Sequence, residues 1–134
     1  MIKLKKISVG DGFRPFIVAE ISANHCGSIN KAKRLIKCAK ENHADAVKIQ
    51  TFTPDTMTLK SNNRYFKIRD GLWKGYTLWD LYNEAQTPLK WHKELFSYAK
   101  EIKIPLFSSP FDETAVDFLE DLRCPFYKIA SFEM

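Results

Sequence analysis

Five polar side chains interrupt segments that are otherwise apolar, and together they could bind an anion. They are Glu20 in IVAEIS, Lys48 and Gln50 in AVKIQTF, Ser109 in LFSSP and Lys128 in FYKIAS. A lysine among apolar residues is costly unless an anion meets it or its pKa falls. Ammonium groups and serine hydroxyls together favour phosphate and carboxylate ligands. The pattern predicts a site for a small, doubly anionic molecule; the alternative for either lysine alone is a buried ion pair with a carboxylate such as Glu20.

Two more polar residues, Ser131 and Glu133, follow Lys128 near the end of the chain. Alternate side chains of a strand point to opposite faces, so Lys128 shares its face with the small Ala130, which leaves room above the lysine for a ligand. Ser131 and Glu133 have the other parity. We therefore expect them to join the same site only if the chain curls after Ala130.

The histidines and one cysteine give weaker indications of chemistry. His25 and Cys26 are adjacent and could bind a metal or form a nucleophilic pair, but neighbouring residues seldom converge in that way, and we expect Cys26 to be an ordinary loop thiol. His43 and His92 lie on or beside predicted helices, and we expect both at the surface. No GxGxxG, P-loop or GxSxG motif indicates a nucleotide or serine-hydrolase site.

Composition narrows the class of protein. The 134 residues are 45% hydrophobic and 13% aromatic, as in a globular domain. The net charge of +5 suits an anionic ligand, but the basic residues form no block of the kind that binds nucleic acid. No long apolar stretch or signal-peptide core occurs, so we expect no membrane partner. The three cysteines are widely spaced, which predicts reduced thiols in a cytoplasmic protein.

The polar residues of the predicted site follow apolar segments that alternate with amphipathic ones. This alternation predicts an α/β fold with a parallel sheet, either a small open sheet or half of an eight-stranded barrel, with ligands at the carboxyl ends of the strands. We expect the first strand to be covered on both faces. The predicted strands are 15–22, 44–52, 104–111 and 125–132, and the predicted helices are 28–42 (capped by Ser28), 87–103 (capped by Thr87) and 112–122 (capped by Asp112).

Two segments lie outside this alternation. Residues 2–9 alternate apolar and basic side chains before a turn, which predicts an exposed strand in a hairpin within residues 1–14. Residues 53–86 form a connection too long for an ordinary loop and rich in aromatic side chains. Helical spacing within 77–85 predicts a short helix there. This insertion could be a lid that stacks on a sugar, a subunit interface or a small satellite core.

Six motifs, taken in order, resemble the sialic acid synthase family, and most of all its pseudaminic acid synthase branch. They are AEISANH, VKIQTFTPDTMT, LWKGYTLWDLY, TPLKWH, SSPFDETAVDFLE and YKIASFE, which together span nearly the whole chain. The resemblance implies a TIM (β/α)8 barrel, of which residues 1–134 would supply one partial domain of about four βα units after the N-terminal hairpin. It also implies that the rest of the barrel and a small antifreeze-like C-terminal domain are absent from this chain.

The resemblance further implies a reaction. Family members condense phosphoenolpyruvate with an N-acetylated amino sugar in its open-chain form and release phosphate. In the pseudaminic branch the sugar is 2,4-diacetamido-2,4,6-trideoxy-altrose and the product is a nine-carbon nonulosonic acid. By resemblance, Glu133 would lie near the sugar aldehyde, and the residues that would hold phosphoenolpyruvate are Lys48, Ser109, Lys128 and Ser131.

Other family features concern proton transfer, metal and assembly. Glu20 matches a second site glutamate, which could accept the proton of the attacking water, and Gln50 would be a supporting donor. The family requires a divalent metal, manganese or magnesium, whose ligands would lie outside this chain. Full-length members are expected to form homodimers.

Three alternatives remain open. The sugar could be that of the N-acetylneuraminate or legionaminate synthases, because the sugar-selecting residues lie largely in residues 53–86 or outside this chain. Lys128 could instead form a Schiff base, as in aldolase barrels. Finally, the chain could be a truncated half-barrel or assembly module without turnover. Unpaired sheet edges favour self-association, so we expect residues 1–134 alone to be poorly folded or self-associated and to lack synthase activity.

Overall fold

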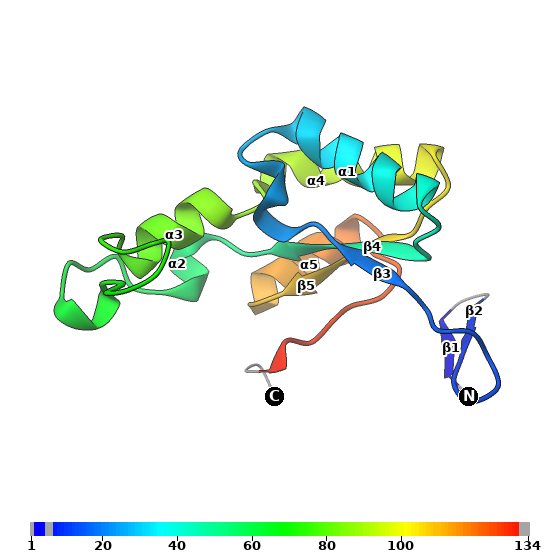
Figure 1. Ribbon diagram of the computed structural model, residues 1–134, viewed down its shortest axis with the longest axis horizontal. Helices are drawn as coiled ribbons and strands as arrows, with labels where there is room; N and C mark the ends of the chain where they lie inside the picture. The colour runs from blue at the N-terminus through cyan, green and yellow to red at the C-terminus, as the bar shows by residue number, and fades with distance from the viewer. Residues whose placement is uncertain (1, 5–6, 132–134) are drawn as a thin grey trace.

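The chain alternates strands and helices after a short N-terminal hairpin (Figure 1). The computed structural model describes residues 2–4 and 7–131. The hairpin pairs β1 with β2 in antiparallel register, so both of its strands lie within residues 2–9, where the alternation predicts one. In chain order the elements are β1 (Ile2–Leu4), β2 (Ile7–Val9), β3 (Val18–Glu20), η1 (Ser22–His25), α1 (Ile29–Glu41), β4 (Ala46–Thr51), α2 (Pro54–Met57), η2 (Arg64–Phe66), α3 (Leu78–Ala85), α4 (Leu89–Glu101), β5 (Leu106–Pro110) and α5 (Glu113–Asp121).

A parallel sheet in the order β3, β4, β5 forms the centre of the fold. Its strands are neighbours both in sequence and in space, with helices between them, which is the pattern of a (β/α) barrel. The strand predicted at 15–22 shrinks to β3, and the expectation that it is covered on both faces is wrong, because Val18 is 38% exposed. Among the described residues β3 pairs only with β4, so its other edge forms no strand pairing there.

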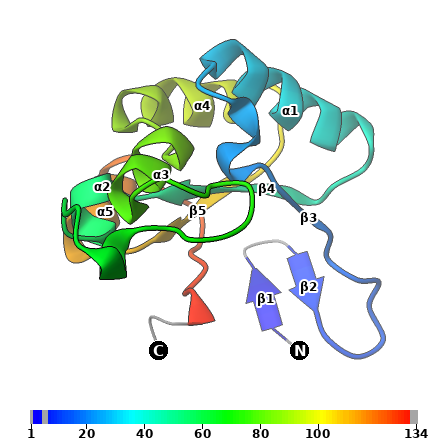
Figure 2. The same ribbon diagram turned by 60° about the vertical axis from the view of Figure 1, so that its left-hand side comes forward.

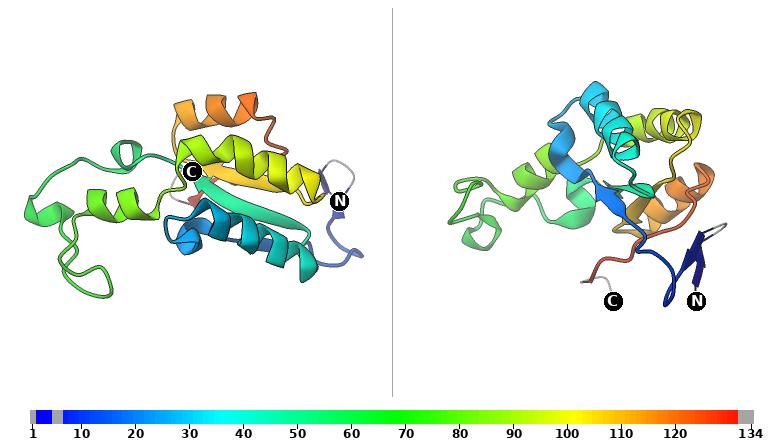
Figure 3. Two further views of the ribbon diagram at one scale, coloured as in Figure 1. Left: turned by 90° about the horizontal axis from the view of Figure 1, so that it is seen from above. Right: turned by 45° about the vertical axis from the view of Figure 1, so that its right-hand side comes forward.

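Helices α1 and α4 pack side by side over one face of the sheet, here called the outer face (Figures 1 and 3). Val47 and Ile49 of β4 point to this face and are fully buried, as strand alternation predicts. They join one apolar cluster with Ile36 of α1 and Leu95 of α4. The segment after α5 runs along the opposite, inner face (Figure 2).

Two of the three predicted helix caps are present. The side chains of Ser28 and Asp112 each accept a hydrogen bond from the main-chain N–H three residues later, at 3.3 and 2.8 Å. The cap predicted at Thr87 is wrong. Pro88 takes the N-cap position without a side-chain hydrogen bond, and the helix begins at Leu89. Thr87 therefore lies one residue too early to cap the helix, and its buried hydroxyl has no partner among the described residues.

The strand predicted at 125–132 is wrong for the part of it that the structure describes. Tyr127 forms a single parallel bridge with Ser108 of β5, and the main-chain N–H of Lys128 donates to Ser108 O at 3.1 Å. Beyond this point the chain leaves the sheet, and Ile129 is 56% exposed. A strand is stabilised by a ladder of backbone hydrogen bonds, and in the described chain this segment makes only one bridge, to β5.

The insertion at 53–86 extends past the carboxyl end of β4 and away from the sheet (Figures 1 and 3). Helix α3 confirms the helix predicted within 77–85. It packs on α2, and Trp79 Nε1 donates to Asp55 Oδ1 at 2.8 Å, as in a small satellite core. Leu72 is nevertheless 100% exposed, and a role as lid or interface stays a prediction. None of the described helices is long and apolar enough to cross a membrane.

Candidate functional site

The inner face of the sheet carries five of the predicted site residues in two adjacent cross-strand rows, here together called the inner-face row. Parallel pairing sets Glu20 beside Lys48, and Gln50 beside Ser109. The bridge between β5 and the segment after α5 continues this register and sets Lys128 beside Ser109. Residues paired in register point to the same side of a sheet. The row therefore faces away from α1 and α4. It also lies near the carboxyl ends of the strands, where barrel enzymes bind their ligands.

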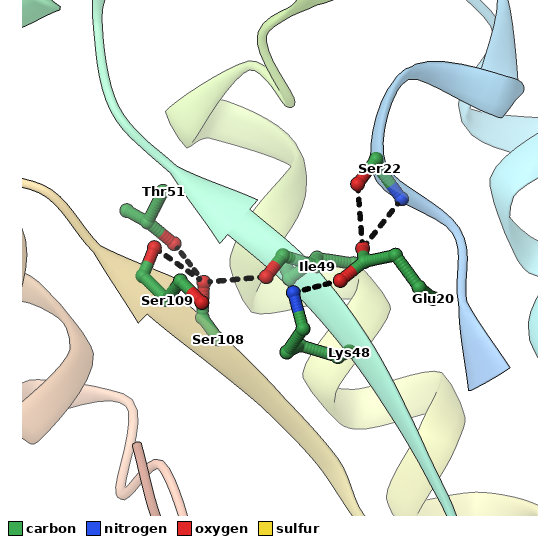
Figure 4. Close-up of polar contacts among 7 residues, drawn as sticks. All are labelled: Glu20, Ser22, Lys48, Ile49, Thr51, Ser108 and Ser109. Atoms are coloured by element: carbon green, nitrogen blue, oxygen red, sulfur yellow. Dashed lines mark hydrogen bonds and ion pairs between the residues drawn. The ribbon is translucent and has the colours of Figure 1, made fainter. Parts of the chain in front are cut away.

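Lys48 forms an ion pair with Glu20 across β3 and β4 (Figure 4). Ser22 donates to the other carboxylate oxygen from its main-chain N–H at 2.9 Å and from its hydroxyl at 2.6 Å. Burial lowers the pKa of Lys48, and the positive charge of Lys128 lowers it further, whereas the carboxylate of Glu20 favours the charged form. The ion-pair alternative thus holds for Lys48, but the positive charge of Lys128 also acts on this amine, so the row favours an added anion.

Ser109 places a buried hydroxyl in this row. Its side chain is 1% exposed, and Oγ has no hydrogen-bond partner among the described residues. A buried hydroxyl without a partner costs free energy, and such groups are uncommon in native proteins. Gln50, its neighbour in register, is half-buried. A ligand oxygen at this point would accept the proton that Ser109 offers.

The segment after α5 supplies Lys128 to the row. The side chain is exposed, and its charge acts on the amine of Lys48. The next residue of the same parity, Ala130, is buried at 4% exposure. Ser131 is exposed and ends the described residues, and Glu133 lies outside them. The membership of Ser131 and Glu133 in the site stays a prediction.

His25 and Cys26 make separate contacts and do not form a nucleophilic pair. His25 is buried, its Nδ1 accepts from the Gly27 N–H at 3.1 Å, and its ring meets Trp91 edge-on with centroids 5.3 Å apart. Burial lowers the pKa of His25, and the charge of Lys31 lowers it further. Cys26 is exposed, with Lys31 Nζ at 3.0 Å from its Sγ. Cys26 is thus a loop thiol, as predicted.

No metal site is formed by the residues that the structure describes, because no three His, Cys, Asp or Glu side chains lie close enough together. The residues present therefore do not fit the divalent metal that the resemblance implies. His43 is exposed, as predicted.

A buried polar chain on the outer face departs from the sequence prediction. His92, expected at the surface, is fully buried. Its Nε2 lies 2.9 Å from Thr51 Oγ1, which lies 2.6 Å from Ser108 Oγ; Figure 4 shows the Thr51–Ser108 contact. A signal was available, because His92 shares a helical face with Leu95 and Ala99, both buried.

Comparison with known proteins agrees with this geometry. Residues 35–134 match the profile of the NeuB family. The chain belongs to the NeuB family. It is 51% identical over 120 residues to the pseudaminic acid synthase of Helicobacter pylori, an alignment that covers 90% of this chain and 35% of that protein. It is 40% identical over 131 residues to the N-acetylneuraminate-9-phosphate synthase of Mus musculus, covering 92% of this chain and 34% of that one.

Solved structures of the family share the fold. The N-acetylneuraminic acid (sialic acid) synthetase of Leptospira borgpetersenii, in complex with citrate, superposes with a TM-score of 0.79 at 26% identity, covering 98% of this chain and 41% of that one. Such neighbours are TIM-barrel enzymes, so the predicted α/β fold and partial barrel are confirmed, as is the resemblance to the sialic acid synthase family. This NeuB-family chain spans about a third of the length of the curated relatives that it matches.

Proposed function

We propose that this chain supplies the phosphoenolpyruvate-binding strands of a NeuB-family synthase that makes a nonulosonic acid of the pseudaminic type. The inner-face row carries the proposal: Lys128 lies beside a buried serine hydroxyl that has no partner among the described residues, and Lys48 lies on the same face, two residues before the Gln50 that adjoins this serine on its other side. Phosphoenolpyruvate bears a phosphate and a carboxylate on three carbons, so one molecule can meet both amines and the hydroxyl. The citrate bound by the Leptospira relative is likewise a small polyanion.

In the proposed reaction, C3 of phosphoenolpyruvate attacks the sugar aldehyde, water adds at C2, and phosphate leaves by C–O cleavage. Lys48 and Lys128 would neutralise the two anionic groups, and Ser109 would donate to one of them. When the ligand meets Lys48, the carboxylate of Glu20 loses its partner and becomes available as a base. The two hydrogen bonds from Ser22 keep that carboxylate oriented, so that Glu20 could accept the proton of the attacking water.

The proposed sugar is 2,4-diacetamido-2,4,6-trideoxy-altrose. Its support is the higher identity to a pseudaminic acid synthase, 51%, than to an N-acetylneuraminate-9-phosphate synthase, 40%. Glu133 is proposed to act beside the aldehyde, Ser131 to bind phosphoenolpyruvate, and Gln50 to donate to the bound groups. The insertion at 53–86 follows the carboxyl end of β4, where it could contribute to sugar selection.

The complete enzyme is proposed to be a metal-dependent homodimer in the cytoplasm. Manganese or magnesium would act as a Lewis acid, with ligands from outside this chain. Cys26 and Cys38 are thiols outside any disulfide, which suits a reducing compartment. One partial barrel domain, with a hairpin at 1–14 and an insertion at 53–86, is the proposed organisation of this chain.

The test is a chimera in which this chain replaces the matching 35% of the Helicobacter pylori pseudaminic acid synthase. We expect phosphate release that requires both phosphoenolpyruvate and the trideoxy-altrose. A folded chimera that releases no phosphate, beside an active parent enzyme, would refute the proposed function. Release with N-acetylmannosamine but not with the altrose would replace the pseudaminic assignment with the sialic one.

Within the chimera, Lys48→Met tests the row directly. Loss of a charged hydrogen bond should raise KM for phosphoenolpyruvate roughly 10- to 100-fold. Lys37→Met is the matched control, because Lys37 lies on the solvent side of α1 and pairs only loosely with Glu41 at 3.6 Å. An unchanged KM in Lys48→Met would show that Lys48 does not bind phosphoenolpyruvate.

A further inference from the structure

The buried chain of His92, Thr51 and Ser108 lies under α4, at the carboxyl ends of β4 and β5. All three side chains have 0% exposure. Thr51 and Ser108 belong to the strands that carry the inner-face row, but they point to the opposite face. Buried polar groups in an otherwise apolar layer are costly unless they hydrogen-bond to one another.

The hydrogen bonds that join these three side chains can run in only one direction. His92 Nδ1 lies 3.2 Å from Pro88 O, which can only accept, so Nδ1 carries the ring proton. His92 Nε2 is then an acceptor and receives the Thr51 hydroxyl proton over 2.9 Å. Thr51 has no second proton, so at 2.6 Å Ser108 must donate to it. The Ile49 carbonyl, 3.2 Å from Ser108 Oγ, is a secondary acceptor (Figure 4).

Ser108 connects the hydrogen-bonded side chains of His92 and Thr51 to the inner face in two ways. It directly precedes Ser109, so the backbone torsions of Ser108 set the direction of the Ser109 hydroxyl on the other side of the sheet. Its carbonyl also accepts the Lys128 N–H at 3.1 Å, which holds the segment that carries Lys128 beside β5. That segment has a single backbone bridge to the sheet, so this hydrogen bond is one of few main-chain contacts that place Lys128, beside the ring contact of Phe126 with Phe107 at 4.4 Å between centroids.

We propose that His92 and Thr51 are positioning residues: their hydrogen bonds fix Ser108, and Ser108 orients Ser109 and Lys128 toward the bound anion. This inference rests on the proposed function, in which the inner-face row binds phosphoenolpyruvate. A purely structural role, in which His92 only anchors α4 to the sheet, predicts loss of stability without a selective loss of phosphoenolpyruvate binding.

The kinetic test uses the chimera with Thr51→Val, which keeps the shape and removes the hydroxyl. We expect KM for phosphoenolpyruvate to rise about tenfold, the loss of one well-placed hydrogen bond, while kcat and KM for the sugar stay within about twofold. Thr51→Ser restores a hydroxyl and should restore KM. Ile36→Val, in the same apolar layer but away from the row, is the control for lost stability. Equal KM values in Thr51→Val and Ile36→Val would overturn the inference.

A ligand-free test uses the ¹⁵N-labelled chimera. The ¹⁵N resonances of His92 should show the proton on Nδ1; a proton on Nε2 would overturn the assigned direction. Amide exchange at Lys128, measured relative to global unfolding, should speed up in Thr51→Val and not in Ile36→Val. Equal exchange in the two variants would show that Ser108 does not depend on Thr51. An inactive wild-type chimera would refute the proposed function, while these measurements would still decide the positioning role.

Discussion

Acidification should unfold this protein partly through His92. Burial lowers the pKa of His92 from 6.5 to about 4, because the ring has 0% exposure and meets Phe118 edge-on at 5.3 Å. His92 therefore binds a proton near pH 6.5 in the unfolded chain, but only near pH 4 in the folded chain. The neutral ring contributes its full stability above pH 6.5, and this contribution is lost as the pH falls from 6.5 to 4.

The magnitude follows from linkage. A shift of about 2.5 units, at about 1.4 kcal/mol per unit, gives about 3 kcal/mol in total. Of this, roughly 2 kcal/mol should be lost between about pH 7 and pH 4.5, because the lower part of the transition lies at more acidic pH. This is a substantial part of the stability of a small domain.

The assay is urea unfolding followed by circular dichroism at several pH values, at a protein concentration where light scattering shows a single species. The comparison is between the wild-type chain and His92→Gln, which cannot titrate. Carboxylates such as Asp45, whose pKa is lowered by Arg14, contribute alike to both proteins and cancel in the difference. Between about pH 7 and pH 4.5, the free energy of unfolding of the wild type should fall by about 2 kcal/mol more than that of the variant. Parallel pH profiles would refute a neutral, buried His92.

Two further predictions concern stability at neutral pH, both measured by urea unfolding. Ser28→Ala should lower the free energy of unfolding by about 1 kcal/mol, because it removes the cap of α1. Ser28→Asp should retain most of this stability, because aspartate can also cap a helix; equal losses in the two variants would exclude the capping role. Leu119→Ala should cost about 2–5 kcal/mol, because Leu119 is fully buried, whereas Leu72→Ala should change stability by less than about 0.5 kcal/mol at 100% exposure. Similar effects at Leu119 and Leu72 would contradict the packing of α5 on the sheet.

The sequence alone determines the features that depend on local interactions. Ser28 and Asp112 cap their helices because each hydrogen bond spans three residues of the chain. Alternation within β4 separates Val47 and Ile49 from Lys48 because successive side chains of a strand point to opposite faces. The row of Glu20, Lys48, Gln50, Ser109 and Lys128 follows from the same rule, once parallel pairing is inferred from the alternation of strands and helices.

The tertiary structure alone decides which of these groups are buried and what they contact. His92 is polar, and only the packing of α4 on β4 and β5 places it beside Thr51 and Ser108. The segment around Lys128 has the composition of a strand, yet it makes one bridge, because a strand forms only where partners offer backbone groups along its edges. Burial and strand pairing depend on residues far away in the chain, and local spacing does not encode them.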